Sequence, residues 1–343
     1  MFQPKRKQYL SSEEHIPCDV VFDILTGLPV KSLIRFRCVS NSWYSTITSR
    51  MFFTTHLNAV LLSNNNNSPN GFLLHMTEKE LCTFVYNSDR TLTEVSRFRN
   101  PFYDHDLFDY CNGVFLFYNC YCRTICLWNP SIQKFRMIAA SANHFPNCYI
   151  TLGLAYHSAN NDFKILLIAV AYGGIDGEQA PPTEAEIYTL STDSWRRAVI
   201  SVGSEPNIGS HIRLERTYLF FNGALHSLAS TQGHNFILSF DVNEETFRKI
   251  MLPQDYINNG LLPILDLSAD IDQQQQLAVF KGSLALIDFP VDRDIGDEIW
   301  HIWVMREYGV FDSWTKLTTV ALSSVERFFG CTDSGELLVK KLF

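Results

Sequence analysis

The segment CYCRTIC contains three cysteines that are candidates for a chemical role: Cys120, Cys122 and Cys126. Thiolates could ligate zinc, but a structural zinc site takes four ligands, usually as two pairs presented by loops. Here the cysteines fall in a segment with the pattern of a β-strand, and free cysteine packs as a small apolar side chain. The spacing therefore favours buried thiols in a sheet core over a metal centre.

Four histidines and one acidic segment are the other candidates. His75, His157, His226 and His301 each lie near an apolar, strand-like run, which favours hydrogen-bonded sheet histidines over metal ligands. The segment DRDIGDE, residues 292–298, lacks the twelve-residue ligand pattern of a calcium loop and predicts an acidic hairpin tip. The sequence contains no P-loop, G-x-S-x-G, H-E-x-x-H or dinucleotide fingerprint. We therefore expect no catalytic residue, no metal and no cofactor.

Composition excludes one class of partner and favours another. The chain has 343 residues, 46% of them hydrophobic, and a net charge of −8. That acidic balance argues against a nucleic-acid-binding protein, which normally presents a basic face. Residues 1–50 hold seven Lys/Arg and four Asp/Glu, whereas the remainder holds 21 Lys/Arg and 32 Asp/Glu, a net charge of −11. The mildly basic N-terminal segment suits an acidic partner.

No segment of the sequence predicts a membrane span or secretion. The longest apolar run, residues 165–172, has eight residues, whereas a helix needs about 20 to cross a bilayer. No secretory signal is visible at the N-terminus. We expect a protein of the cytoplasm, the nucleus or both, whose nine cysteines are thiols.

The N-terminal module predicts three short helices. Pro17 suits the first turn of one helix, and Gly27 suits its C-terminal end. Pro29 opens a second helix, and Ser40 is a candidate N-cap for a third. Three such helices in about 40 residues are near the lower limit for an independent fold. We therefore expect the module to complete its apolar burial against another chain.

After an Asn-rich stretch that predicts a linker, the pattern changes to strands and stays so. Four pairs of aromatic residues repeat across polar turns, six or seven residues apart: Trp128/Phe135, Tyr188/Trp195, Phe240/Phe247 and Tyr308/Trp314. The second members of these pairs lie 60, 52 and 67 residues apart, near the roughly 50-residue period of kelch blades. A single four-stranded sheet cannot bury both faces, so neighbouring sheets must stack around an axis.

Two further features complete the repeat. The segments CNGVFLF, FNGALHSL and FKGSLALI share a glycine that allows a tight turn into an apolar strand. The chain ends at SGELLVKKLF, where the pattern predicts a truncated last blade with an exposed sheet edge.

The segments PCDVVFDIL, LPVKSLIRFRCVSNSWYSTI and FFTTHL resemble an F-box, and the whole chain resembles plant F-box proteins with a kelch-like F-box-associated domain. Within that family the chain resembles the S-locus F-box group, and the sequence leaves open an S-locus role or a general F-box role. The resemblance implies an α+β multidomain protein: a three-helix F-box at residues 11–58, a linker at 59–70, and an all-β, propeller-like domain at 71–343 with a truncated last blade. It also implies the substrate-recognition subunit of an SCF-type (Skp–cullin–F-box) ubiquitin ligase, without catalytic activity of its own.

In that family the F-box docks a Skp-type adaptor, which connects to a cullin and the ubiquitin-conjugating machinery, while the β domain holds a target protein for degradation. Carried onto this sequence, the adaptor contacts are Pro17, Ile24, Leu25, Leu28, Pro29, Val30, Lys31, Leu33, Arg35, Phe36, Val39 and Trp43. The bend at Leu28-Pro29 would present apolar side chains from two helices on one surface, and a basic rim would speed association with an acidic adaptor. Leu25 and Val39 suit the module's own core equally well.

Two alternatives stay open, and the target is not identified. A carbohydrate-binding, kelch-like propeller would need no adaptor, and a receptor with a truncated last blade could act as a non-productive decoy. Target binding is expected at loops that converge on one end of the propeller. The candidate loops are residues 143–150, 172–184, 203–213 and 288–298.

Overall fold

The computed structural model divides into two compact units, Met1–Ser68 and Pro69–Phe343. It describes residues 16–49, 51–52, 55–56, 72–76, 80–86, 91–99, 102, 104–129, 132, 134–140, 148–171, 183–201, 212–215, 217–231, 234–254, 275–288, 298–322, 325–332 and 334–341. The predicted linker, residues 59–70, lies outside these ranges. The two units are described separately.

The first unit contains the three predicted helices: α1 (Cys18–Thr26), α2 (Val30–Phe36) and α3 (Asn41–Thr48). Pro17 and Pro29 each stand immediately before a helix, and Gly27 caps the C-terminal end of α1. The Ser40 hydroxyl accepts a hydrogen bond from the backbone N–H of Trp43 at 3.1 Å, as expected of an N-cap. The local signals in the sequence therefore set the helix ends correctly.

A small apolar core holds the helices together. Leu25, Leu33 and Phe52 are buried, and six partly buried side chains pack around them. The rings of Phe22 and Phe52 meet edge to face, with centroids 5.3 Å apart. A core of this size leaves much of the apolar surface of the helices uncovered within the unit.

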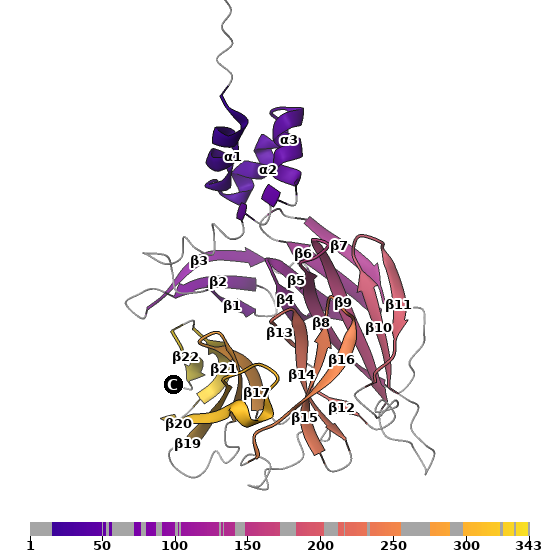
Figure 1. The fold of residues 1–343 in the computed structure, drawn as a ribbon, viewed down its shortest axis with the longest axis vertical. Helices are drawn as coiled ribbons and strands as arrows, with labels where there is room; N and C mark the ends of the chain where they lie inside the picture. The colour runs from indigo at the N-terminus through magenta and orange to yellow at the C-terminus, as the bar shows by residue number, and fades with distance from the viewer. Residues whose placement is uncertain are drawn as a thin grey trace, which may run out of the picture. The chain divides into compact units, whose positions relative to one another are not determined.

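The second unit is built from antiparallel sheets (Figure 1). The first three are β1 (Phe72–Met76), β2 (Glu80–Tyr86) and β3 (Leu92–Arg99); β4 (Asp106–Cys111), β5 (Val114–Asn119), β6 (Thr124–Asn129) and β7 (Lys134–Ala139); and β8 (Cys148–His157), β9 (Asp162–Ala171), β10 (Glu184–Thr189) and β11 (Ser194–Ala198).

Three further sheets follow in chain order. They are β12 (Arg213–Leu214), β13 (Leu219–Phe221), β14 (Ala224–Thr231), β15 (His234–Asp241) and β16 (Thr246–Met251); β17 (Gln275–Phe280), β18 (Ser283–Asp288), β19 (Glu298–Met305) and β20 (Trp314–Leu322); and β21 (Val325–Cys331) with β22 (Leu337–Lys341). Among the described residues the last sheet has two strands.

From β4 onward, one strand of each sheet contacts a strand of the next sheet. β4 contacts β8, β8 contacts β13, β13 contacts β17, and β17 contacts β21. Figure 1 shows these sheets side by side in chain order. Each of these sheets therefore packs against the next one along the chain. This is the propeller-like arrangement that the repeat predicts.

The recurring glycine motif forms one kind of hairpin turn. In all three copies the two central residues have positive φ: Asn112 and Gly113 (46° and 80°), Asn222 and Gly223 (50° and 73°), and Lys281 and Gly282 (49° and 74°). A two-residue turn of this type matches the twist of the flanking strands. The predicted role of the glycine is confirmed, and the residue before it shares the left-handed conformation.

Three of the four aromatic pairs are direct cross-strand partners, as predicted. Trp128 pairs with Phe135, Tyr188 with Trp195, and Phe240 with Phe247. The fourth pair is different, because the connection from β19 to β20 is longer. There Trp314 faces Met305, and Tyr308 lies in the connection.

The tryptophans that begin the return strands also bond to the preceding sheet. The indole N–H of Trp195 donates to the carbonyl of Ala139 at 3.0 Å, and that of Trp314 donates to the carbonyl of Met251 at 2.8 Å. Ala139 and Met251 are the last residues of β7 and β16. Equivalent positions in two blades therefore connect neighbouring sheets in the same way.

Replacing either tryptophan by phenylalanine removes this hydrogen bond while keeping an aromatic ring. We expect Trp195→Phe and Trp314→Phe each to lower the free energy of unfolding of the β unit by about 1 kcal/mol. Chemical denaturation followed by circular dichroism measures the change. Tyr121→Phe is the control, because the Tyr121 side chain is 93% exposed. Equal stability of all three variants would contradict the proposed connection.

Candidate functional site

Large apolar side chains stay exposed on all parts of the helical unit. They are Ile16, Val20, Ile24, Ile34, Val39, Tyr44 and Met51, and their exposed fractions run from 36% to 68%. Scattered apolar residues are normal on a protein surface, but so many on a unit of this size are typical of an interaction surface. We call these seven residues the exposed apolar set.

Two of the predicted adaptor contacts are not on this surface. Leu25 and Leu33 are 0% and 5% exposed, and they form the unit's core with Phe52. Leu25 thus has the core role that the sequence left open for it, and Leu33 shares that role; adaptor contact by either residue stays a prediction. The small unit needs both of them to hold α1 against α2, so they support the surface from below.

The remaining predicted contacts fall into two groups. Pro17, Ile24, Pro29, Arg35 and Val39 are exposed, whereas Leu28, Phe36 and Trp43 are half-buried against the core. The side chains of Val30 and Lys31 lie outside the described part of the structure. The Phe36 and Trp43 rings pack on each other edge to face, with their centroids 5.5 Å apart.

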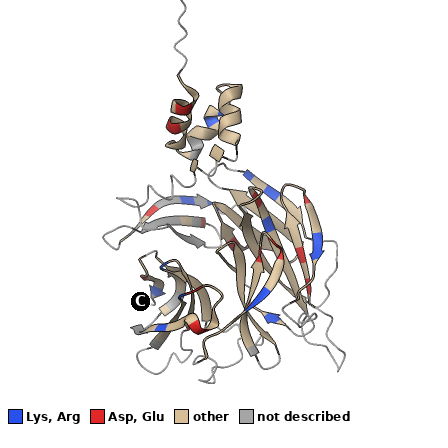
Figure 2. Ribbon diagram, viewed as in Figure 1, with Lys and Arg blue, Asp and Glu red and all other residues tan. Residues whose placement is uncertain are grey.

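Two contacts that the sequence did not reveal fix the shape of this surface. His56 Nε2 lies 2.9 Å from the carbonyl oxygen of Leu28, at the bend before Pro29. The Arg37 guanidinium lies over the Tyr44 ring, 5.1 Å from its centroid. Figure 2 shows acidic positions on α1 and a basic position on α2. The helices that carry the exposed apolar set therefore also carry charges of both signs.

Five members of the exposed apolar set were not among the predicted contacts: Ile16, Val20, Ile34, Tyr44 and Met51. One signal in the sequence could have found Val20. It precedes Ile24 by four residues, and residues at that spacing share one face of a helix.

The candidates for chemistry do not form a site. Cys126 is buried as predicted, but Cys120 and Cys122 are exposed, because the chain turns between β5 and β6 instead of continuing as a strand. His226 is buried and bonded, as a sheet histidine should be, to the Leu219 carbonyl at 3.2 Å. In the described part of the chain, no group of three or more His, Cys, Asp or Glu side chains could hold a metal ion. The acidic segment at 292–297 lies outside that part.

The predicted target-binding loops cannot be described as a surface. Residues 143–147, 172–182, 203–211 and 289–297, which make up most of them, lie outside the described ranges. None of the helices in the described ranges is both long enough and apolar enough to cross a membrane.

The fold defines a protein with a small helical module and a β-propeller-like domain. Residues 14–55 match the F-box domain family, and residues 72–341 match the family of the F-box associated beta propeller domain. The second match covers most of the chain. The chain therefore belongs to the F-box proteins with an F-box-associated β-propeller domain.

Curated relatives agree with this assignment. F-box protein CPR1 of Arabidopsis thaliana is 27% identical over 326 residues, which cover 89% of this chain and 73% of the relative. An F-box/kelch-repeat protein of the same plant is 24% identical over 323 residues, which cover 90% of this chain and 80% of the relative. Among solved structures, an alpha-L-arabinofuranosidase from Lactobacillus brevis matches 70% of this chain and 83% of its own, at 12% identity and a TM-score of 0.39. That value is too low to carry an argument.

The exposed apolar set should be dispensable for folding. Because Ile24 and Val39 are 55% and 59% exposed, Ile24→Ser and Val39→Ser should change the unit's stability by no more than about 0.5 kcal/mol each. Leu25→Ala should lower it by about 2–5 kcal/mol, since it leaves a cavity in a very small core. Hydrogen exchange of backbone amides in residues 18–48 measures both effects. Similar losses of protection in all three variants would show that the surface is structural.

Proposed function

We propose that this chain is the substrate-recognition subunit of an SCF-type ubiquitin ligase. In this proposal the helical unit docks a Skp-type adaptor, which connects to a cullin and the ubiquitin-conjugating machinery, and the β unit holds a target protein. The observation that carries the proposal is the exposed apolar set on a folded F-box. Membership of the F-box family, through residues 14–55, supports it.

The energetics of docking follow from burial. A buried side chain of the size of Ile24 or Val39 contributes roughly 1.5–3 kcal/mol when a partner covers it. Binding energy in interfaces concentrates on a few such side chains at the centre, while the surrounding charges mainly set the rate of association. Arg35 is exposed and basic, which suits an acidic adaptor. Leu25 and Leu33 would act indirectly, by holding the two helices in place.

The β unit would contribute specificity without chemistry of its own. F-box proteins are typically non-catalytic adaptors. Holding a target near activated ubiquitin raises the effective concentration of its lysines, and this effect alone can accelerate transfer. The described ranges contain free thiols throughout, which suits the cytoplasm or the nucleus as the site of action.

Charge placed on the exposed apolar set should prevent docking without unfolding the unit. We expect the double variant Ile24→Asp/Val39→Asp to bind a purified Skp-type adaptor at least about 100-fold more weakly than the unchanged chain, because each carboxylate would be buried in an apolar interface. Biolayer interferometry with the full chain measures the affinity. Val199→Asp, at a 75%-exposed residue of the β unit, is the matched control. Binding of the double variant at full strength would refute the docking model.

A further inference from the structure

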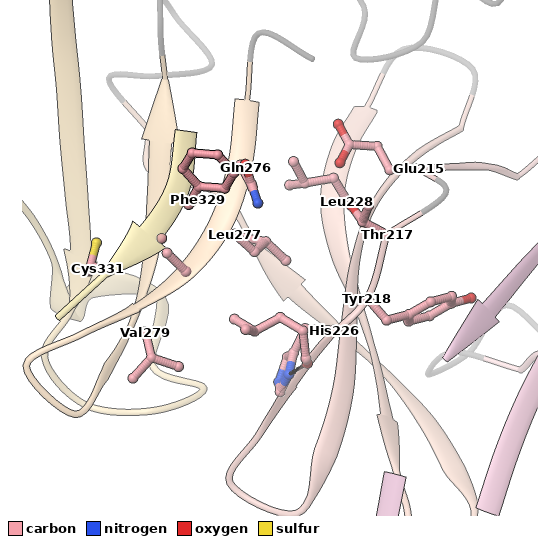
Figure 3. A pocket seen from close by; sticks show the side chains of 13 residues that line it. Glu215, Thr217, Tyr218, His226, Leu228, Gln276, Leu277, Val279, Phe329 and Cys331 are labelled. Atoms are coloured by element: carbon pink, nitrogen blue, oxygen red, sulfur yellow. Dashed lines mark hydrogen bonds between the residues drawn. The ribbon is translucent and has the colours of Figure 1, made fainter. Parts of the chain in front are cut away.

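A cavity of about 250 Å³ lies between three consecutive sheets of the β unit (Figure 3). Its described walls come from Glu215, from residues 217–219, and from β14, β17 and β21. Leu219, Leu228, Leu277 and Phe329 make much of the surface apolar. Strands of three consecutive sheets thus line a partly open space that their side chains do not fill.

Glu215 is the only acidic residue among the described residues that line this cavity. It is 8% exposed, and Figure 3 shows its carboxylate turned toward β17 and β21, across the cavity. The backbone of Glu215 is fixed, since its N–H donates to the Leu228 carbonyl at 3.0 Å and its own carbonyl accepts from the Ser227 hydroxyl at 3.3 Å. Among the described residues, however, no N–H or O–H group donates a hydrogen bond to the carboxylate.

An acid in this position is unfavourable for the fold. Burial raises the pKa of Glu215 to about 8, because a carboxylate loses hydration there. Buried polar groups in folded proteins are nearly always hydrogen-bonded, and leaving one unbonded lowers stability. A group that breaks this rule in a cavity is a candidate for ligand binding.

The other lining groups leave room for a cation. None of the described lining residues is Lys or Arg, so no positive charge faces Glu215 from the described walls. His226 contributes no charge near pH 7, since burial lowers its pKa to about 4. Its ring nitrogens are already bonded, Nδ1 to the Leu219 carbonyl at 3.2 Å and Nε2 to the Tyr308 hydroxyl at 2.6 Å.

We propose that this cavity binds a primary ammonium group at the end of a short apolar chain, with the Glu215 carboxylate as its counter-ion. The leucines and Phe329 would surround the chain, and Gln276 and Thr217 offer additional polar atoms in the lining. The volume is below the range of about 300–1,000 Å³ typical of pockets for drug-sized ligands. It suits a single long side chain or a molecule of that size.

Two sources carry this chemistry: the lysine side chain of a protein, and a free alkylamine. When an ammonium group binds, Glu215 loses its proton and forms an ion pair with it in an apolar surrounding. A neutral molecule of the same shape cannot form this ion pair and should therefore bind with lower affinity. Adaptor docking plays no part in this, because the cavity lies entirely within the unit Pro69–Phe343.

Binding of n-pentylamine and n-pentanol to the full chain tests the site. The two molecules have the same chain length and differ in charge. We expect saturable binding of the amine, measured by titration calorimetry, and at least about tenfold weaker binding of the alcohol. Glu215→Gln should bind the amine at least about tenfold more weakly, while Glu307→Gln, at an exposed glutamate, should bind it as the unchanged chain does.

N-acetyl-lysine methylamide distinguishes the two sources of the ammonium group. If its affinity equals that of pentylamine, the ligand is a protein side chain; if its affinity is lower, the ligand is a free amine.

The unfolding temperature of Glu215→Gln without ligand provides a second measurement. If Glu215 serves a ligand, Glu215→Gln should unfold at the same temperature as the unchanged chain or at a higher one, because it removes a buried ionisable group without a partner. A lower unfolding temperature, or failure to fold, would show a structural role and overturn the proposal. Equal amine binding by Glu215→Gln and the unchanged chain, or no amine binding at all, would also overturn it.

Discussion

Apolar surface that a small element cannot cover by itself governs both units of this protein. In the β unit the neighbouring sheets provide the cover. One buried cluster joins residues of β5 and β6 to residues of β8 and β9, a second joins β8–β10 to β14 and β15, and a third joins β14–β16 to β17–β19. A fourth continues to the last sheet through Phe328. These four clusters each span two neighbouring sheets, so the blades they join depend on one another for stability. The helical unit has no such neighbour within its own compact fold, and its apolar surface is correspondingly exposed.

Polar contacts between sheets fix how the blades align. The Asp109 carboxylate on β4 accepts the backbone N–H of Leu154 on β8 at 2.6 Å. Lys164 on β9 donates to the Val242 carbonyl at 2.8 Å and to the Glu245 carboxylate at 2.7 Å, in the turn between β15 and β16. Burial lowers the pKa of Lys164, yet its two acceptors hold the ammonium in place. Apolar packing alone tolerates small displacements, whereas these directional bonds do not. They therefore give the stacked sheets one relative position.

The sequence predicts features that depend on neighbouring residues and misses those that depend on distant ones. A glycine after Asn112 is enough to set a hairpin turn, and a spacing of seven is enough to pair Trp128 with Phe135, because both follow from chain geometry. The assignment of Leu25 to the core and Ile24 to the surface depends on where α2 packs, which helical spacing does not specify. Glu215 is missed for the same reason. In the sequence it is an ordinary charged residue of a strand-like segment, and only the fold buries it.

The two candidate sites depart from a stable fold in opposite ways. On the helical unit apolar side chains are left in water, whereas in the β unit a carboxyl group is left in an apolar cavity. Each departure lowers stability, and each would be relieved by binding: the first by an apolar partner surface, the second by a cation. Ile24 and Glu215 belong to separate compact units with separate cores. The free energies of binding at the two sites should therefore add. A chain built in this way can exchange what its β unit binds without altering how its helices dock.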